Sequence, residues 1–313
     1  MSEQIVIIGA GQAAAQAVTT LKAEGFGGSI VLVGDEAFPP YQRPPLSKAY
    51  LMGKLERERL FLKPDSFYPE AHCELLLGVS ARAIDRKAKT VLLSDGSRKA
   101  YDKLLIATGT RVRKIKVPGA ELPGVHYLRS VADVDLLSPA IVPGKTLAVV
   151  GGGYIGLEVA AVARKLGLNV VVFEALDRLM ARAVSPQLSA FYEQAHRAEG
   201  VELLFKTGVE AFEGAGKVER VRAGGKVYPV DLVLVGIGAV PNVELAEEAG
   251  LTCDDGIVVD KFCTSVSDPM IFAAGDCTRH HGHNGEEIRL ECVQNAIDQA
   301  KHAALAMMGK PTP

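Results

Sequence analysis

The sequence predicts an α/β protein with two domains that each carry a parallel sheet, and three observations support this prediction. An apolar run from Ile5 to Ile8 leads into a glycine turn and then into small residues that open a helix. The same succession returns after Leu147 to Val150. Short apolar runs of this kind are typical of strands buried on both faces of a parallel sheet. The length of 313 residues suits two domains of ordinary size.

The first glycine turn has the spacing G-x-G-x-x-G/A, which is typical of a dinucleotide-binding (Rossmann-like) domain. Gly9 permits the tight turn, Gly11 lets the backbone approach a pyrophosphate, and Ala14 is small enough for the helix to pack on the strand. The amide groups at the start of that helix then face the phosphates. A glycine turn with no nucleotide is the alternative, and the repetition of the pattern weighs against it.

A second strand is expected at Ser29 to Val33, after a helix that stops at Gly25. Asp35 follows that strand at about the distance expected of a carboxylate that binds a ribose hydroxyl. We favour this role over that of a solvated loop acid. Small residues end a further strand at positions 107–109, where a ligand or another chain segment could pass closely.

A stiff loop with two prolines lies at positions 41–48, and it carries the cations Arg43 and Lys48. They are either two surface cations or contacts to the cofactor. Ser47 is expected to cap a helix that begins at Lys48.

The second glycine turn contains Gly151, Gly153 and Gly156, and a strand from Asn169 to Phe173 follows its helix. Glu174 ends that strand and forms the second ribose carboxylate. A negative side chain there repels a 2′-phosphate, so NADH is preferred over NADPH. Arg178 lies four residues later and weakens that preference slightly.

Glu158 falls early on the apolar helix after the second turn. A buried carboxylate without a partner is costly, so one interpretation pairs Glu158 with Lys48. The other is an exposed glutamate stabilised by the helix dipole, and the sequence alone leaves both open.

The last segment repeats one feature of the first. The chain that leaves the strand Asp231 to Val235 resembles the chain at positions 107–109, which leaves a strand of the first segment. A short strand ending at Ala274 then places Asp276 at its carboxyl end, where ligands of open parallel sheets lie. The expected segments are 1–109, 110–235 and 236–313.

Composition excludes several classes of protein. Thirty-five basic and 37 acidic residues give a net charge of −2, which predicts no nucleic-acid partner. No signal peptide and no membrane span are expected, and five scattered cysteines suit a reducing cytoplasm. One loop gathers four side chains of metal-ligating type, but it lacks a second ligand pair, so we predict no metal site: Cys277, His280, His281 and His283.

Two dinucleotide sites in one chain suit hydride transfer from a nicotinamide to a flavin. The runs GAGQAA, LVGDE, PYQRPPLSKAYL, LLIATG, GGGYIGLEVAA, VVVFEA, GIGAVPN, IFAAGDC and RLECVQNAIDQA span nearly the whole chain. Together they resemble the FAD-dependent, NADH-oxidising ferredoxin reductases of bacterial P450 and ring-hydroxylating dioxygenase systems. The resemblance implies two domains of the glutathione reductase type, with a discontinuous FAD domain (1–109 and 236–313) around an NAD domain (110–235).

The resemblance also implies the cofactor contacts. Seven positions would touch FAD: Ala13, Asp35, Lys48, Ala81, Arg129, Asp276 and Val293. Gly9, Gly11, Ala14 and Arg43 join them by the local argument above. The NAD set is Gly151, Gly153, Gly156 and Glu174, and Tyr154 would lie near the nicotinamide. Similar proteins pair the lysine of PPLSK with the glutamate of GYIGLE, which favours the Lys48–Glu158 pair beside the flavin.

Positions 43–48 contain no cysteine, whereas disulfide reductases carry a C-x-x-x-x-C pair there. Without a thiol relay, electrons must leave singly from the flavin, which suits a [2Fe–2S] ferredoxin. The resemblance makes Lys301 a basic docking position, although it is also compatible with a solvated helix face. The alternatives are an NADH oxidase or peroxidase and a regulatory flavoprotein that resembles apoptosis-inducing factor. A third, C-terminal interface domain that the resemblance implies is expected to be absent from this sequence, which contains no Trp.

Overall fold

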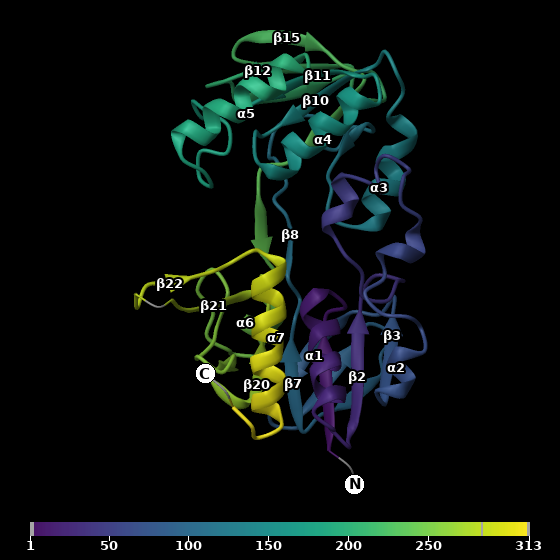
Figure 1. Cartoon of the computed structure of the whole chain (residues 1–313), viewed down its shortest axis with the longest axis vertical. Coiled ribbons are helices and arrows are strands. Elements are labelled where there is room, and N and C mark those ends of the chain that lie inside the picture. The colour runs from purple at the N-terminus through teal and green to yellow at the C-terminus, as the bar shows by residue number, and fades with distance from the viewer. Residues whose placement is uncertain (1–2, 283, 312–313) are drawn as a thin grey trace. The chain divides into compact units, whose positions relative to one another are not determined.

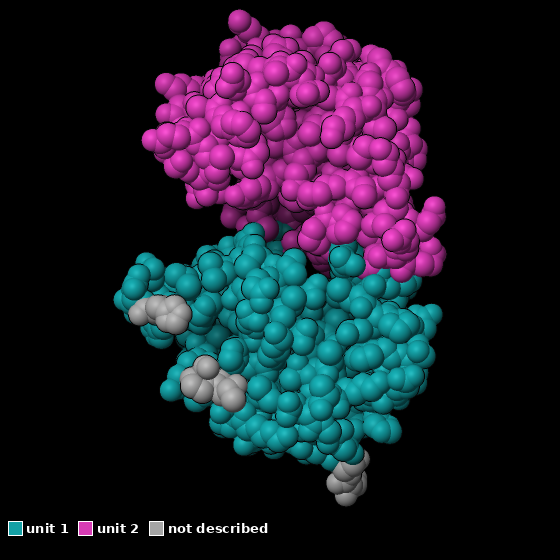
Figure 2. All heavy atoms as spheres, viewed as in Figure 1, with its two compact units in different colours: residues 1–42, 61–111, 241–313 teal, residues 43–60, 112–240 magenta. Residues whose placement is uncertain are grey.

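The computed structural model describes residues 3–282 and 284–311, which form two compact units (Figures 1 and 2). Unit 1 comprises residues 1–42, 61–111 and 241–313, and unit 2 comprises residues 43–60 and 112–240. Residues 43–60 are the notable difference from the expected segments, because this stretch packs with unit 2. The chain passes between the units through β8 (Thr110–Val112) and β17 (Ala239–Pro241), which pair with each other.

Unit 1 is built on a six-stranded sheet in the order β19-β20-β7-β1-β2-β3. The central strands are parallel and apolar on both faces, as their sequences predict. The strand bounds are β1 Gln4–Ile8, β2 Ser29–Gly34, β3 Cys73–Leu77, β7 Lys103–Ile106, β19 Thr264–Ser265 and β20 Asp268–Ala273.

Helices α1 (Gln12–Ala23) and α7 (Val293–Met307) lie side by side against one face of this sheet (Figure 1). Their contact surfaces are largely alanine, so the two helices approach closely. Alternate strand residues such as Val6 and Ile8 face the other way, into a second core. Helix α2 (Phe67–Glu70) packs into the first core, with α1 and α7. The remaining smaller elements of the unit are β4 Ala81–Asp85, β5 Thr90–Leu93, β6 Arg98–Ala100, α6 Glu244–Glu248, β18 Ile257–Val258, β21 Thr278–His281 and β22 Glu287–Ile288.

Unit 2 has a five-stranded parallel sheet in the order β12-β11-β10-β16-β9. A three-stranded antiparallel sheet, β13-β14-β15, shares a hydrophobic core with it, while α4 packs against β10 and β11. The bounds are β9 Val125–His126, α3 Val131–Leu137, η3 Ser138–Ala140, β10 Thr146–Val150, α4 Tyr154–Lys165, β11 Asn169–Phe173, α5 Pro186–Ala198, β12 Val201–Leu204, β13 Val209–Glu213, β14 Arg220–Ala223, β15 Lys226–Pro229 and β16 Leu232–Val235.

One local prediction is wrong. Ser47 does not cap a helix starting at Lys48; it is the last residue of the short 3₁₀ helix η1 (Pro44–Ser47), and Lys48 follows as its C-cap. The next regular element of this stretch is the 3₁₀ helix η2 (Arg57–Leu60). Two prolines favour a tight turn here, and the Ser47 hydroxyl is used in a tertiary contact described below. Within the described residues, every helix is too short or too polar to cross a bilayer.

Candidate functional site

The two glycine turns are built alike, one in each unit. Gly9 and Gly151 have positive φ angles of 110° and 102°. A Cβ atom at Gly9 would lie 2.1 Å from the carbonyl oxygen of Ala107, and one at Gly151 would lie 2.4 Å from that of Gly236. Each turn is therefore pressed against the end of the neighbouring strand, β7 or β16, and only glycine fits. The segments that follow β7 and β16 therefore contact the glycine turns in the same way, which confirms the predicted similarity between the two segments.

The second glycine of each turn is open instead of crowded. Gly11 and Gly153 are the N-caps of α1 and α4, and a Cβ atom at either would meet no heavy atom within 4 Å. The space beside each helix start is thus available to a ligand that approaches the backbone, and the helix dipole favours an anion there. We call the spaces beside Gly11 and Gly153 the glycine cradles, and they fit the pyrophosphate groups of FAD and NAD(P).

The third position of each turn packs the helix onto its sheet. A Cβ atom at Gly156 would lie 2.3 Å from the carbonyl oxygen of Gly151, so α4 starts in close contact with the turn. Ala14 occupies the equivalent place in unit 1 and is fully buried, with Ala13 beside it. One methyl group is accommodated there, which agrees with the looser G/A rule at this position.

In each unit an acidic residue comes at the end of the strand that follows the glycine-turn helix. Asp35 comes directly after β2 and is exposed. Glu174 follows β11, and its two carboxylate oxygens accept hydrogen bonds from the backbone amides of Gly152 (2.7 Å) and Leu176 (2.8 Å). Glu174 is therefore held against the glycine turn, with the orientation of its carboxylate fixed.

Arg178, the cation near Glu174, is engaged elsewhere. Its guanidinium donates to the carbonyl oxygens of Val184 at 2.9 Å and Ala181 at 2.7 Å. The half-buried side chain thus stabilises the loop before α5 through these hydrogen bonds. The sequence could not show these hydrogen bonds, because they depend on the backbone conformation of residues 178–184.

Lys48 and Glu158 form an ion pair, with 2.6 Å between Nζ and Oε2. The structure therefore agrees with the interpretation in which Glu158 pairs with Lys48. Their side chains are 49% and 28% exposed, so the pair is only partly shielded from solvent. Ser47, which is 1% exposed, donates from Oγ to the same carboxylate oxygen at 2.5 Å. Sequence reasoning missed this second donor.

Further contacts join residues 43–60 to unit 2. The Arg43 guanidinium donates to the backbone carbonyl oxygen of Arg129 at 2.7 Å, which brings two predicted flavin contacts together. Arg57 and the Tyr50 hydroxyl both donate to Asp135 on α3, at 2.8 and 3.0 Å. These contacts and the Lys48–Glu158 pair explain why this stretch packs with α3 and α4.

The remaining predicted positions lie in unit 1. Asp276 follows the turn after β20, and the Thr110 hydroxyl lies 3.4 Å from its carboxylate. Ala81 opens β4, just after backbone hydrogen bonds from residues 78 and 79 tie that segment to the end of β2 near Asp35. Val293 is the first residue of α7 and is 43% exposed.

In the loop where no metal site is predicted, Cys277 and His280 contact other protein groups. The fully buried Cys277 thiol lies within hydrogen-bond distance of backbone carbonyl oxygens, and burial raises its pKa. The ring of His280 contacts Gln299. His283 lies outside the described residues, and among the described ones no group of three or more His, Cys, Asp or Glu side chains could hold a metal ion.

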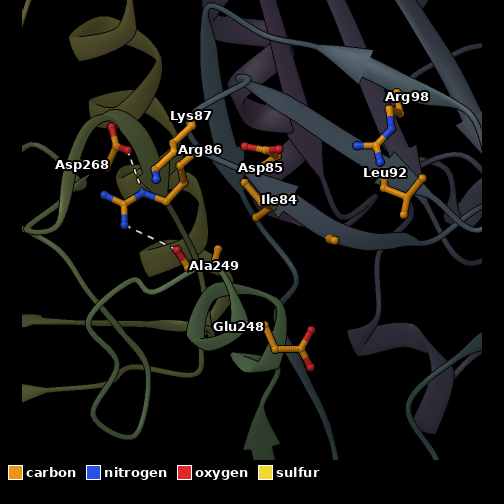
Figure 3. A pocket seen from close by; sticks show the side chains of 10 residues that line it. Ile84, Asp85, Arg86, Lys87, Leu92, Arg98, Glu248, Ala249 and Asp268 are labelled. Atoms are coloured by element: carbon orange, nitrogen blue, oxygen red, sulfur yellow. Dashed lines mark hydrogen bonds and ion pairs between the residues drawn. The ribbon is translucent and has the colours of Figure 1, made fainter.

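An open hollow of about 750 Å³ lies in unit 1 and shares no lining residue with the predicted sites. Arg86 crosses it, bonded to Asp268 at 2.9 Å and to carbonyl oxygens that include that of Ala249 (Figure 3). These bonds tie the small β4-β5-β6 sheet to α6 and β20, so Arg86 has a structural role.

Comparisons with known proteins agree with this geometry. A family model described as "Pyridine nucleotide-disulphide oxidoreductase" matches residues 3–303. Rhodocoxin reductase of Rhodococcus erythropolis is 47% identical over 312 residues, which is 98% of this chain and 73% of that protein. The ferredoxin–NAD(+) reductase subunit of the benzene 1,2-dioxygenase system of Pseudomonas putida is 41% identical over 312 residues, covering 99% and 75%. The crystal structure of a covalent putidaredoxin reductase–putidaredoxin complex matches with a TM-score of 0.96 at 40% identity, covering 99% and 76%.

Proposed function

The chain belongs to the pyridine nucleotide-disulphide oxidoreductase family, whose members use FAD and NAD(P), and on this basis we propose that it passes electrons from NADH through FAD to a [2Fe–2S] ferredoxin. That ferredoxin would serve a P450 or an aromatic-ring dioxygenase. One observation carries the proposal above the others: each unit has its own open glycine cradle at the start of a long helix. The free cysteines suit a reducing compartment, and we place the reaction in the cytoplasm.

In this proposal unit 1 binds FAD. The α1 amide groups behind Gly11 would hold the pyrophosphate, Asp35 the ribose, and Asp276 with the start of α7 the other end of the cofactor. When bound, the flavin supplies the capacity to accept two electrons as hydride and to release them one at a time.

Unit 2 binds the nicotinamide nucleotide, with its pyrophosphate at Gly153 and its ribose at Glu174. Glu174 supports a preference for NADH because its fixed negative charge would repel a 2′-phosphate. Arg178 supports it too, since its guanidinium is already bonded to two carbonyl oxygens. Titration with NADH and NADPH tests the preference: we expect much tighter binding of NADH, and equal affinities would contradict it.

Lys48 and Glu158 are the residues we assign to the electron-transfer site. The ammonium group of Lys48 is a hydrogen-bond donor and a local positive charge, and Glu158 and Ser47 restrict where it can lie. Such a charge beside the flavin favours the reduced, electron-rich state of the ring. Neither residue needs to act as a nucleophile.

The acceptor distinguishes the proposal from its rivals. Enzyme reduced by NADH is mixed, in separate experiments, with oxidised ferredoxin, oxygen or peroxide, and flavin reoxidation is followed. Rapid reoxidation by ferredoxin alone is the expected result, because positions 43–48 hold no thiol that could reduce peroxide. Equally fast reaction with oxygen or peroxide would favour an oxidase or peroxidase. Slow reduction without reoxidation would favour a regulatory flavoprotein.

We assign Lys301 to ferredoxin docking. It lies on α7 and is exposed, and its ammonium group lies 3.5 Å from the carboxylate of Asp298. If it attracts an acidic ferredoxin, Lys301→Glu and added salt should both slow ferredoxin reduction. Lys217→Glu, at an exposed position of unit 2, makes the same charge change as a control. Equal rates for the wild type and Lys301→Glu at low salt would remove this assignment.

A further inference from the structure

A buried glutamine joins helix α7 to the turn that follows β20. Gln299 is 7% exposed, and its Oε1 atom accepts a hydrogen bond from the backbone amide of Gly275 at 2.8 Å. The hydroxyl of Thr278 lies 2.8 Å from the same oxygen and 2.9 Å from the carbonyl oxygen of Gly275, so its one proton is shared between these two acceptors. The Asn295 side-chain amide lies 3.3 Å from the same oxygen. The Oε1 atom of Gln299 thus contacts polar groups from three places: α7, the turn and β21.

The other side of the Gln299 amide faces a histidine. Nε2 of Gln299 lies 3.2 Å from Nδ1 of His280. Because Oε1 already accepts from Gly275, Nε2 must be the donor here, and Nδ1 of His280 must carry a lone pair. Burial lowers the pKa of His280, and the neighbouring His281 lowers it further, which agrees with a neutral ring. The glutamine therefore has a single orientation in which both ends of its amide are satisfied.

The turn that Gln299 holds lies next to the helices α1 and α7. Gly275 has a φ of 87°, and a Cβ atom added to it would lie 3.4 Å from Cβ of Ala13 on α1 and 3.6 Å from Cβ of Ala296 on α7. The starts of both helices therefore border this turn. Asp276 is the next residue, so the hydrogen bond that fixes the Gly275 backbone also fixes the position of Asp276.

We propose that Gln299 is a positioning residue for flavin binding: by holding the Gly275 amide and the Thr278 hydroxyl, it sets the place of Asp276 and of the starts of α1 and α7. The assignment rests on the proposed function, in which these three features surround FAD. Gln299 itself touches no part of the cofactor in this account. Its effect passes through the backbone of the turn.

The test measures the dissociation constant for FAD of the apo-protein by flavin fluorescence, together with the thermal midpoint of the apo-protein. Gln299→Leu keeps the volume but removes the acceptor and the donor. Gln299→Glu keeps an acceptor oxygen for Gly275. Ala303→Gly weakens α7 at a fully buried position one turn further on, without touching the four partners of Gln299.

We expect FAD affinity to fall about tenfold or more in Gln299→Leu, to recover largely in Gln299→Glu, and to stay near the wild-type value in Ala303→Gly. The circular dichroism of bound flavin should change in Gln299→Leu alone, because Asp276 shifts there. If affinity follows the thermal midpoint in all three variants, or is unchanged in Gln299→Leu, the assignment is overturned. Wild-type apo-protein that takes up no FAD would overturn the proposed function, and this assignment with it.

Discussion

At Glu158, two donors of different character meet one carboxylate oxygen. Lys48 carries a charge but is half exposed, whereas Ser47 is neutral and almost completely buried. Solvent screening reduces a partly exposed ion pair to about 0–1 kcal/mol. A buried hydrogen bond to a charged group contributes about 1.5–3 kcal/mol.

We therefore predict that Ser47→Ala lowers the free energy of unfolding by about 1.5–3 kcal/mol and that Lys48→Met lowers it by less than about 1 kcal/mol. For the rate of flavin reduction by NADH the order should reverse, because in the proposed site Lys48 brings a charge to the flavin and Ser47 does not. Denaturant unfolding and stopped-flow reduction measure the two effects on the same variants. A greater loss of stability in Lys48→Met would contradict the prediction.

At the scale of single elements, the glycine turns make a prediction that separates binding from folding. Gly153→Ala should bind NADH about tenfold or more weakly, because the new methyl group fills the open cradle. Its loss of stability should stay within about 1 kcal/mol, the usual difference between glycine and alanine at an N-cap. Gly11→Ala is the matched variant in unit 1, and it should weaken FAD binding while leaving NADH binding intact.

Gly156→Ala provides the contrasting control. Its methyl group would lie 2.3 Å from the Gly151 carbonyl oxygen, so the helix start must shift, at a cost of about 1–3 kcal/mol. Thermal unfolding and equilibrium titration with each nucleotide distinguish the three variants. Normal NADH affinity in Gly153→Ala would show that the cradle does not hold the pyrophosphate.

The elements themselves were largely predictable, because their signals are local. The strands before each glycine turn, the helices that follow, and the strand Asn169–Phe173 lie where the apolar runs and glycines place them. The sequence predicts a helix cap at Ser47 because capping is also a local rule. Its actual partner is 111 positions away, and no local pattern could show that.

The same limit applies to the candidate site. The Lys48–Glu158 contact was open to sequence reasoning because burial demands a partner for a carboxylate on an apolar helix. The Gln299 network was not, although a glutamine on the alanine-rich face of a helix is a signal of a buried polar contact. The position of residues 43–60 depends on several contacts with α3 and α4 at once, which the sequence does not reveal.

At the scale of the whole molecule, histidines in both units predict how stability depends on pH. The pKa values of His126, His196 and His280 are lowered from 6.5, chiefly by burial. Well above pH 6.5 these rings are neutral in both the folded and the unfolded chain. As the pH falls below 6.5, the unfolded chain takes up protons that the folded chain excludes, so the free energy of unfolding decreases.

Thermal or denaturant unfolding of the apo-protein from pH 7.5 down to about pH 5 measures this decrease. His196→Asn should make the profile shallower, since one of the three rings no longer titrates. A free energy of unfolding that rises as the pH is lowered through this range would contradict the prediction.

The most direct measurement of the central claim is an anaerobic titration of the FAD-reconstituted protein with NADH, followed in the visible spectrum. The account predicts that the protein takes up FAD, that an equimolar amount of NADH bleaches the flavin band, and that oxidised [2Fe–2S] ferredoxin restores it. A folded protein that remains colourless after incubation with FAD, or whose bound flavin is not reduced by NADH, would contradict the account.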